Sequence, residues 1–291
     1  MRGVVRRKLV VKERNRDSEI LRRLGEWEQR NAPLPQFLEL QAKLLRLQVG
    51  LRSQLSWPQS AATKETASRQ LREGLPLLEF DDLSLDWTLV QDQFHTVTGI
   101  LEGYLTEGRG EARGLRNLAS NTPLLQQVVR DWYRGLSLSS VATEHCVTEA
   151  LLGAVVQATL SPFLVAYSEG LGGLVNQEVW RRRHCPICGG KPDFAFLDKE
   201  KGARWLLCSR CDAEWLFQRL ECPYCGTHNQ ESLGYLSDDT ELYRLYTCEE
   251  CHCYIKAVDL RKAEADILMP LERIMTVDLD RQAEEAGYSP G

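Results

Sequence analysis

The sequence lacks the short motifs that mark several common classes of active site. It contains no Gly-x-Ser-x-Gly elbow, no Walker loop and no His-Glu-x-x-His helix. The Cys-x-x-Cys pairs that it does contain lack the βαβ setting in which a redox-active pair sits at the start of a helix. We therefore predict no catalytic residues, no organic cofactor and no enzyme activity.

The N-terminal residues lack the apolar segment of a secretory signal. Residues 1–12 are rich in Arg and Lys and contain no seven-residue hydrophobic region. The most apolar stretch, 150–167, includes polar residues and a central Pro162, so we interpret it as a buried helix that breaks and restarts at the proline. We expect a cytoplasmic protein without membrane insertion, whose cysteines stay reduced.

An excess of basic charge is also missing. The formal net charge is −5, and acidic and basic side chains balance between residues 180 and 262. Proteins that bind nucleic acids concentrate Lys and Arg on the surface that meets the phosphates. We therefore expect no nucleic-acid partner. The alternative function, which this charge balance disfavours, is that of a zinc-ribbon protein that binds nucleic acid.

Cysteine is the residue type that the sequence concentrates. Nine of its ten cysteines lie in residues 185–253, and eight of them form four Cys-x-x-Cys pairs. Two pairs together supply four thiolates for one tetrahedral metal ion. The first and third pairs share the pattern Cys-Pro-x-Cys-Gly, in which glycine can adopt the positive φ of a sharp turn and backbone N–H groups can point at the sulfurs.

The cysteine stretch is an internal duplication with an offset of about forty residues. In each copy the two pairs are separated by a segment that suits a β-hairpin, and a third strand follows. We predict strands at 194–197, 204–207 and 215–217 in the first copy, and at 232–236, 242–247 and 254–258 in the second.

The spacing favours sequential pairing of the cysteines, with one complete site in each copy. The predicted ligands of the first ion are Cys185, Cys188, Cys208 and Cys211. Those of the second are Cys222, Cys225, Cys248 and Cys251. A cross-braced arrangement, in which the first and third pairs share an ion, is the alternative. Cys253 is left over, either as a replacement for Cys251 or as a free thiol, and the spacing favours Cys251. Four sulfurs suit zinc or iron equally well.

Helical periodicity dominates the chain before the cysteines. Apolar residues recur at steps of three and four, for example at Phe37, Leu40 and Leu44. We expect a basic, poorly patterned and mobile arm at 1–16, then six or seven helices, with Cys146 as a small buried residue. The predicted class is α plus small β, with an all-α domain at 1–180, four-cysteine ribbons at 181–219 and 220–262, and a tail at 263–291.

These motifs resemble the FdhE family of formate dehydrogenase accessory proteins. The residues that carry the resemblance are 185–189, 208–215, Arg219 with 222–226, and 248–256. The resemblance implies a cytoplasmic chaperone that binds the catalytic subunit of a respiratory formate dehydrogenase and supports its maturation before twin-arginine export. It also implies two rubredoxin-like iron sites, with zinc as the alternative metal and electron transfer as an alternative role. A homo-oligomer is compatible with the sequence.

Overall fold

The structure is a computed structural model of the 291-residue chain and describes residues 2–55, 62–104, 109–237 and 240–291. Side chains are described from residue 16 onward within these ranges, Arg109 excepted. The chain forms two compact units. One consists of residues 1–56 and 80–163, and the other of residues 57–79 and 164–291. The finer boundaries expected at 180, 219 and 262 stay a prediction.

The first unit is helical. Its helices are α1 (Arg2–Asn31), α2 (Gln36–Arg52), α4 (Trp87–Glu102), α5 (Arg109–Ala119), α6 (Thr122–Tyr133), α7 (Ser139–Glu144) and most of α8 (Glu149–Leu171). Side chains cap several helix starts. The Asp86 carboxylate accepts hydrogen bonds from the first backbone N–H groups of α4, and Asn121 does the same for α6.

Two expectations for the helices were wrong. The arm expected at 1–16 is helical from Arg2 onward, because α1 begins there. Arg and Lys are good helix formers, so a helix can form there without an apolar stripe. The second error concerns Pro162, which lies inside an unbroken α8. The lost hydrogen bond costs about 3 kcal/mol, and the fully buried Leu160 and Leu164 beside it offset this at about 1.5–3 kcal/mol each.

Helix α8 is also the most apolar helix of the described residues. The stretch of residues 149–174 is long and apolar enough to cross a bilayer. However, 67% of its most apolar window is buried inside the protein. A core helix of a folded domain has this burial, which agrees with the expected buried helix.

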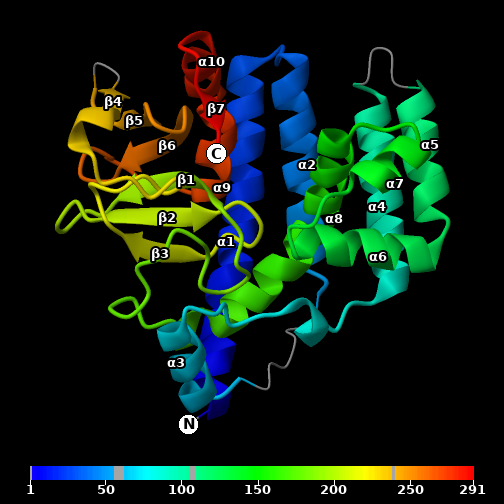
Figure 1. Ribbon diagram of the computed structural model, residues 1–291, viewed down its shortest axis with the longest axis horizontal. Coiled ribbons are helices and arrows are strands. Elements are labelled where there is room, and N and C mark those ends of the chain that lie inside the picture. Colours follow the sequence, from blue (N-terminus) through cyan, green and yellow to red (C-terminus); the bar gives the residue numbers. More distant parts are fainter. Residues whose placement is uncertain (1, 56–61, 105–108, 238–239) are drawn as a thin grey trace. The chain divides into compact units, whose positions relative to one another are not determined.

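The second unit contains one seven-stranded sheet (Figure 1). The first copy of the duplication supplies β1 (Pro192–Leu197), β2 (Arg204–Cys208) and β3 (Glu214–Phe217). The second supplies β4 (Leu233–Ser237), β5 (Tyr243–Cys248) and β6 (Cys253–Asp259). All six predicted strands are present, within two residues at each end. The predicted class is therefore confirmed: a helical region precedes a strand-rich region that holds two four-cysteine clusters.

The two copies join edge to edge, which the duplication did not predict. The strand order is β3-β2-β1-β6-β5-β4, and β1 pairs with β6 in parallel, with Phe194 opposite Lys256. Neighbouring strands within each copy are antiparallel. Phe194, Phe196, Leu207 and Val258 share one buried cluster with Met269. The sheet core thus draws on both copies and on the residues after them.

The residues after the second copy fold onto the sheet rather than trail from it. They form α9 (Met269–Met275), α10 (Val277–Glu285) and β7 (Ser289–Pro290), and β7 pairs with β6. Helix α3 (Lys64–Glu73) also belongs to this unit. The Asp280 carboxylate fixes α10, because it accepts hydrogen bonds from the Tyr254 hydroxyl at 2.8 Å and from Lys256 Nζ at 2.6 Å.

Replacing Asp280 with alanine is expected to lower the free energy of unfolding of the sheet unit by about 2–3 kcal/mol. The Lys256 side chain is only 7% exposed, so its ammonium group would lose the carboxylate that balances it. Urea denaturation would measure the change. Asp278→Ala is the matched control, because Asp278 on the same helix is 75% exposed and pairs with Arg281 at the surface. Equal losses for both variants would contradict the prediction.

Candidate metal centre

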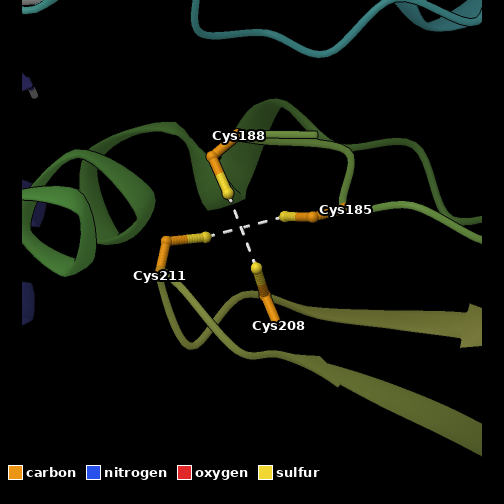
Figure 2. A group of neighbouring side chains, drawn as sticks. All are labelled: Cys185, Cys188, Cys208 and Cys211. Atoms are coloured by element: carbon orange, nitrogen blue, oxygen red, sulfur yellow. Dashed lines mark hydrogen bonds between the residues drawn. The ribbon is translucent and has the colours of Figure 1, made fainter. Parts of the chain in front are cut away.

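The first four cysteines point their sulfurs at one another (Figure 2). Cys185 and Cys188 lie in the loop before β1, and Cys208 and Cys211 lie at the turn between β2 and β3. The Sγ atoms of Cys185 and Cys211 are 3.6 Å apart, and those of Cys188 and Cys208 are 3.5 Å apart. All four side chains are buried, at 4% exposure or less.

The second four cysteines repeat this geometry with a more open cover. The Sγ atoms of Cys222 and Cys251 are 3.7 Å apart, as are those of Cys225 and Cys248. Cys222 and Cys248 are buried, Cys251 is half-buried and Cys225 is exposed. The same sulfur arrangement therefore occurs in two different environments.

These distances fit a tetrahedral metal ion. A metal–sulfur bond of about 2.3 Å places the sulfurs of a tetrahedral site about 3.8 Å apart. Within each cluster the four sulfurs lie within 4.8 Å of one another, so each cluster could hold a metal ion. The sequential pairing, not the cross-braced one, is the arrangement that brings the sulfurs together. That the eight cysteines bind an ion stays a prediction.

Each Cys-x-x-Cys pair sits in the same kind of backbone turn. The residue directly after each pair has a positive φ, namely Gly189 at 71°, Asp212 at 53°, Gly226 at 83° and His252 at 52°. Backbone N–H groups of Ile187, Arg210 and Tyr224 donate to the first sulfur of their pairs at 3.3–3.4 Å. The turn expected for the two glycines is therefore confirmed, and the other two pairs adopt it without glycine.

Burial acts against free thiolates in the first cluster. It raises the pKa of the Cys185 and Cys211 thiols well above the usual value. Without a cation these two thiols keep their protons at neutral pH. Binding of an ion must therefore release protons, and the ion supplies the charge that a buried thiolate needs.

Two arginines stand near the second cluster, and the cysteine spacing alone does not reveal them. Arg204 on β2 is buried and donates to the carbonyl oxygens of Gln218 and Glu221. Burial lowers its pKa to about 10, so it stays charged at neutral pH. Arg183 donates to the carbonyl oxygen of Tyr224, between the cysteines of the third pair. Four thiolates and a divalent ion carry a net charge of about −2, which both guanidinium groups offset.

A third arginine supports the first cluster from α9. Arg273 donates to the Cys208 carbonyl oxygen at 2.6 Å, to Asp193 at 2.8 Å and to Asp212. Asp212 is the residue of positive φ after Cys211. Because Arg273 lies 62 residues after Cys211 in the sequence, no local pattern pointed to it.

The structure also describes the other residues that the sequence analysis singled out. Cys253 Sγ donates to the Cys251 carbonyl oxygen at 3.4 Å and lies outside both groups of four sulfurs. Trp215 is fully buried and donates through Nε1 to the Arg182 carbonyl oxygen, whereas Arg219 is exposed. The expectation that Cys146 is buried was wrong. It is exposed with φ 55°, because it takes the left-handed position just after α7.

Comparison with known proteins identifies relatives of the chain. A family model described as "FdhE, central domain" matches residues 184–219, which hold the first cluster. "Protein FdhE homolog" of Aquifex aeolicus is 36% identical over 157 residues, 53% of this chain and 54% of that protein. The Pseudomonas aeruginosa homologue is 32% identical over 148 residues, 47% of this chain and 45% of its own length.

The sequence matches thus span about half the length of these relatives. The similarity in fold covers more of the chain than the sequence matches do. The crystal structure of the FdhE protein from Pseudomonas aeruginosa superposes with a TM-score of 0.61 at 24% identity, over 94% of this chain and 92% of that one. The family model and the sequence relatives thus make this chain similar to proteins of the FdhE family, and the crystal structure shows that it shares their fold.

Proposed function

We propose that this protein is a cytoplasmic accessory protein that binds the catalytic subunit of a respiratory formate dehydrogenase and supports its maturation before twin-arginine export. The observation that supports this is the pair of four-sulfur clusters on one sheet, in a chain similar to proteins of the FdhE family. A site with four protein sulfurs leaves no coordination position for a substrate. The clusters thus suit a protein that recognises its partner and does not transform it.

Each cluster binds one ion in this proposal, through Cys185, Cys188, Cys208 and Cys211 or through Cys222, Cys225, Cys248 and Cys251. The ion is iron in a rubredoxin-like site, and the all-sulfur donor set supports a soft or borderline metal. Metal analysis of protein purified without exposure to air is expected to give two equivalents of iron and visible absorption. Two equivalents of zinc with no visible absorption would contradict the choice of iron and leave the four-sulfur sites intact.

A pull-down tests the partner. The tagged full chain, incubated with an extract of cells that make a respiratory formate dehydrogenase, is expected to retain the catalytic subunit of that enzyme. Cys253→Ala is a matched control, because it removes a cysteine outside both clusters and should retain the subunit equally well. Deletion of the gene should also abolish most formate dehydrogenase activity. Full activity in the deletion strain, or recovery of nucleic acid in a salt-dependent manner, would refute the accessory role.

A further inference from the structure

The two clusters have different covers. Over the first, the backbone N–H groups of Leu77 and Leu78 donate to the carbonyl oxygens of Pro186 and Ile187, each at 2.9 Å. Both leucines are almost fully buried. Pro186 and Ile187 lie between the cysteines of the first pair, so an internal stretch of the chain closes this cluster from solvent.

The second cluster has an open side. Cys225 is exposed and Cys251 is half-buried. A pocket next to this cluster is lined by Cys222, Cys248 and the exposed Arg219, among others. The second cluster is therefore more open to solvent than the first, whose four cysteines are all buried.

Residues 288–291, here the end segment, contact the turns of the second cluster. The Tyr288 hydroxyl donates to the Glu249 carboxylate, and the Ser289 N–H donates to the His252 carbonyl oxygen at 2.8 Å. Strand β7 pairs with β6 at Cys253 and Tyr254. Gly291 lies so close to the Tyr224 ring that a Cβ atom would come within 2.3 Å of it.

The surface that receives the end segment is built largely from the turns of the second cluster. Tyr224 lies between Cys222 and Cys225, and Glu249 lies between Cys248 and Cys251. His252 is the residue of positive φ that follows Cys251. A bound ion that holds the four sulfurs together fixes these turns, so it also fixes the positions that hold the end segment.

Tyr288 packs against the buried cluster of Leu245, Tyr254 and Ala283, and beyond Tyr288 the contacts of the end segment are few. Each hydrogen bond contributes about 0.5–1.5 kcal/mol net, and ordering each residue costs about 1–2 kcal/mol. Such a balance leaves the segment close to the point of release. The segment stays docked while the turns that it contacts are rigid. Once these turns move, the free energy of its contacts no longer exceeds the entropy cost of ordering it.

We propose that the second cluster is the exchangeable metal site of this protein, and that the end segment is docked when this cluster holds its ion and released when the ion leaves. The first cluster keeps its ion throughout. The inference rests on the metal binding proposed above. Release uncovers Tyr224 and the edge of β6 at Cys253 and Tyr254, so metal occupancy changes the surface that the protein presents.

Metal release kinetics test the difference between the clusters, with zinc as the probe because four sulfurs suit zinc or iron. The full chain is loaded with zinc and mixed with excess EDTA, and the zinc that remains bound is measured with time. We expect two phases of one equivalent each, with rates at least tenfold apart. Cys225→Ala should bind one equivalent and lack the fast phase.

Two equivalents that leave at one rate, or a fast phase that persists in Cys225→Ala, would overturn the inference. Fewer than two bound equivalents in the unaltered chain would instead refute the metal binding on which it rests. The pull-down proposed above does not depend on either outcome. A wrong choice of partner can therefore be told apart from a wrong account of metal exchange.

Proteolysis tests the end segment. Chymotrypsin cleaves after tyrosine, and the loss of the residues that follow Tyr288 is visible in the intact mass. Cleavage after Tyr288 is expected to be at least tenfold faster once the fast-phase zinc has left, and to slow again when zinc is restored. Equal cleavage with and without that zinc would overturn the coupling.

Coupling must also act in the reverse direction, because linkage between two binding events is reciprocal. Tyr288→Phe removes the hydroxyl that donates to Glu249. It is expected to speed the fast phase of zinc release several-fold and leave the slow phase unchanged. Tyr235→Phe is the control, since Tyr235 is an exposed tyrosine on β4. An unchanged fast phase in Tyr288→Phe would refute the coupling.

Discussion

Replacing Cys208 with alanine is expected to remove the ion of the first cluster and to unfold the sheet unit. Cys208 is the last residue of β2, pairs with Pro192 of β1 and offers its carbonyl oxygen to Arg273. A structural zinc site in a small domain contributes about 10–16 kcal/mol of binding free energy. That is as large as the whole stability of a typical domain, about 5–15 kcal/mol.

Metal analysis and circular dichroism would check this expectation. Cys208→Ala should bind at most one equivalent and lose most of its strand signal. Cys253→Ala is the matched control, because it removes a cysteine of the same sheet whose sulfur contacts the Cys251 carbonyl oxygen and belongs to neither cluster. It should keep two equivalents and the full strand signal. A Cys208→Ala protein that kept two ions would show that the four sulfurs do not form one site.

Replacing Arg273 with methionine is expected to cost about 3 kcal/mol of folding free energy and to speed the loss of metal from the first cluster. The Arg273 side chain is 20% exposed, and that of Asp212 is 15% exposed. Burial alone would lower the pKa of Arg273, but the Asp193 and Asp212 carboxylates raise it above the usual value. The guanidinium group therefore stays charged, and its removal takes away the positive charge that pairs with Asp193 and Asp212.

Urea denaturation of the zinc-loaded chain would measure this loss. Arg281→Met is a suitable control, because Arg281 on α10 is 68% exposed and pairs with Asp278 at the surface. Its loss should be within about 0.5 kcal/mol of zero. Arg273→Lys should fall between the two, since an ammonium group keeps the charge but cannot make the forked contacts of guanidinium. If Arg273→Met and Arg281→Met were equally stable, the role of Arg273 would be refuted.

The strands and the turns of the clusters could be predicted because their signals are local. A hairpin between two Cys-x-x-Cys pairs requires only alternating apolar residues and a turn. The turn after Cys188 requires only a residue that readily adopts a positive φ, and glycine is that residue. Cys225 has the same local sequence pattern as Cys188, yet one is exposed and the other buried. The turn that ends at Cys188 accepts hydrogen bonds from Leu77 and Leu78, more than a hundred residues before the first pair.

The contacts between distant segments could not be predicted in the same way. Arg183 reaches the turn of the second cluster at Tyr224, 41 residues later in the sequence. Parallel pairing of β1 with β6 depends on side chains such as Phe194 and Val258, which pack in one core from two copies. Neither contact leaves a periodic pattern in the sequence, because each depends on how whole elements dock.

The parallel pairing of β1 with β6 has a consequence for synthesis of the chain. Leu197 of β1 pairs with Asp259 of β6, about sixty residues later. Ribosomes add about 5–20 residues per second, so β1 leaves the ribosome several seconds before its neighbour exists. During that interval β1 is an open sheet edge, the kind of surface that pairs with other chains. If the first four cysteines bind an ion early, strands β1–β3 can fold before the second copy is synthesised. The free edge of β1 stays open until β6 pairs with it.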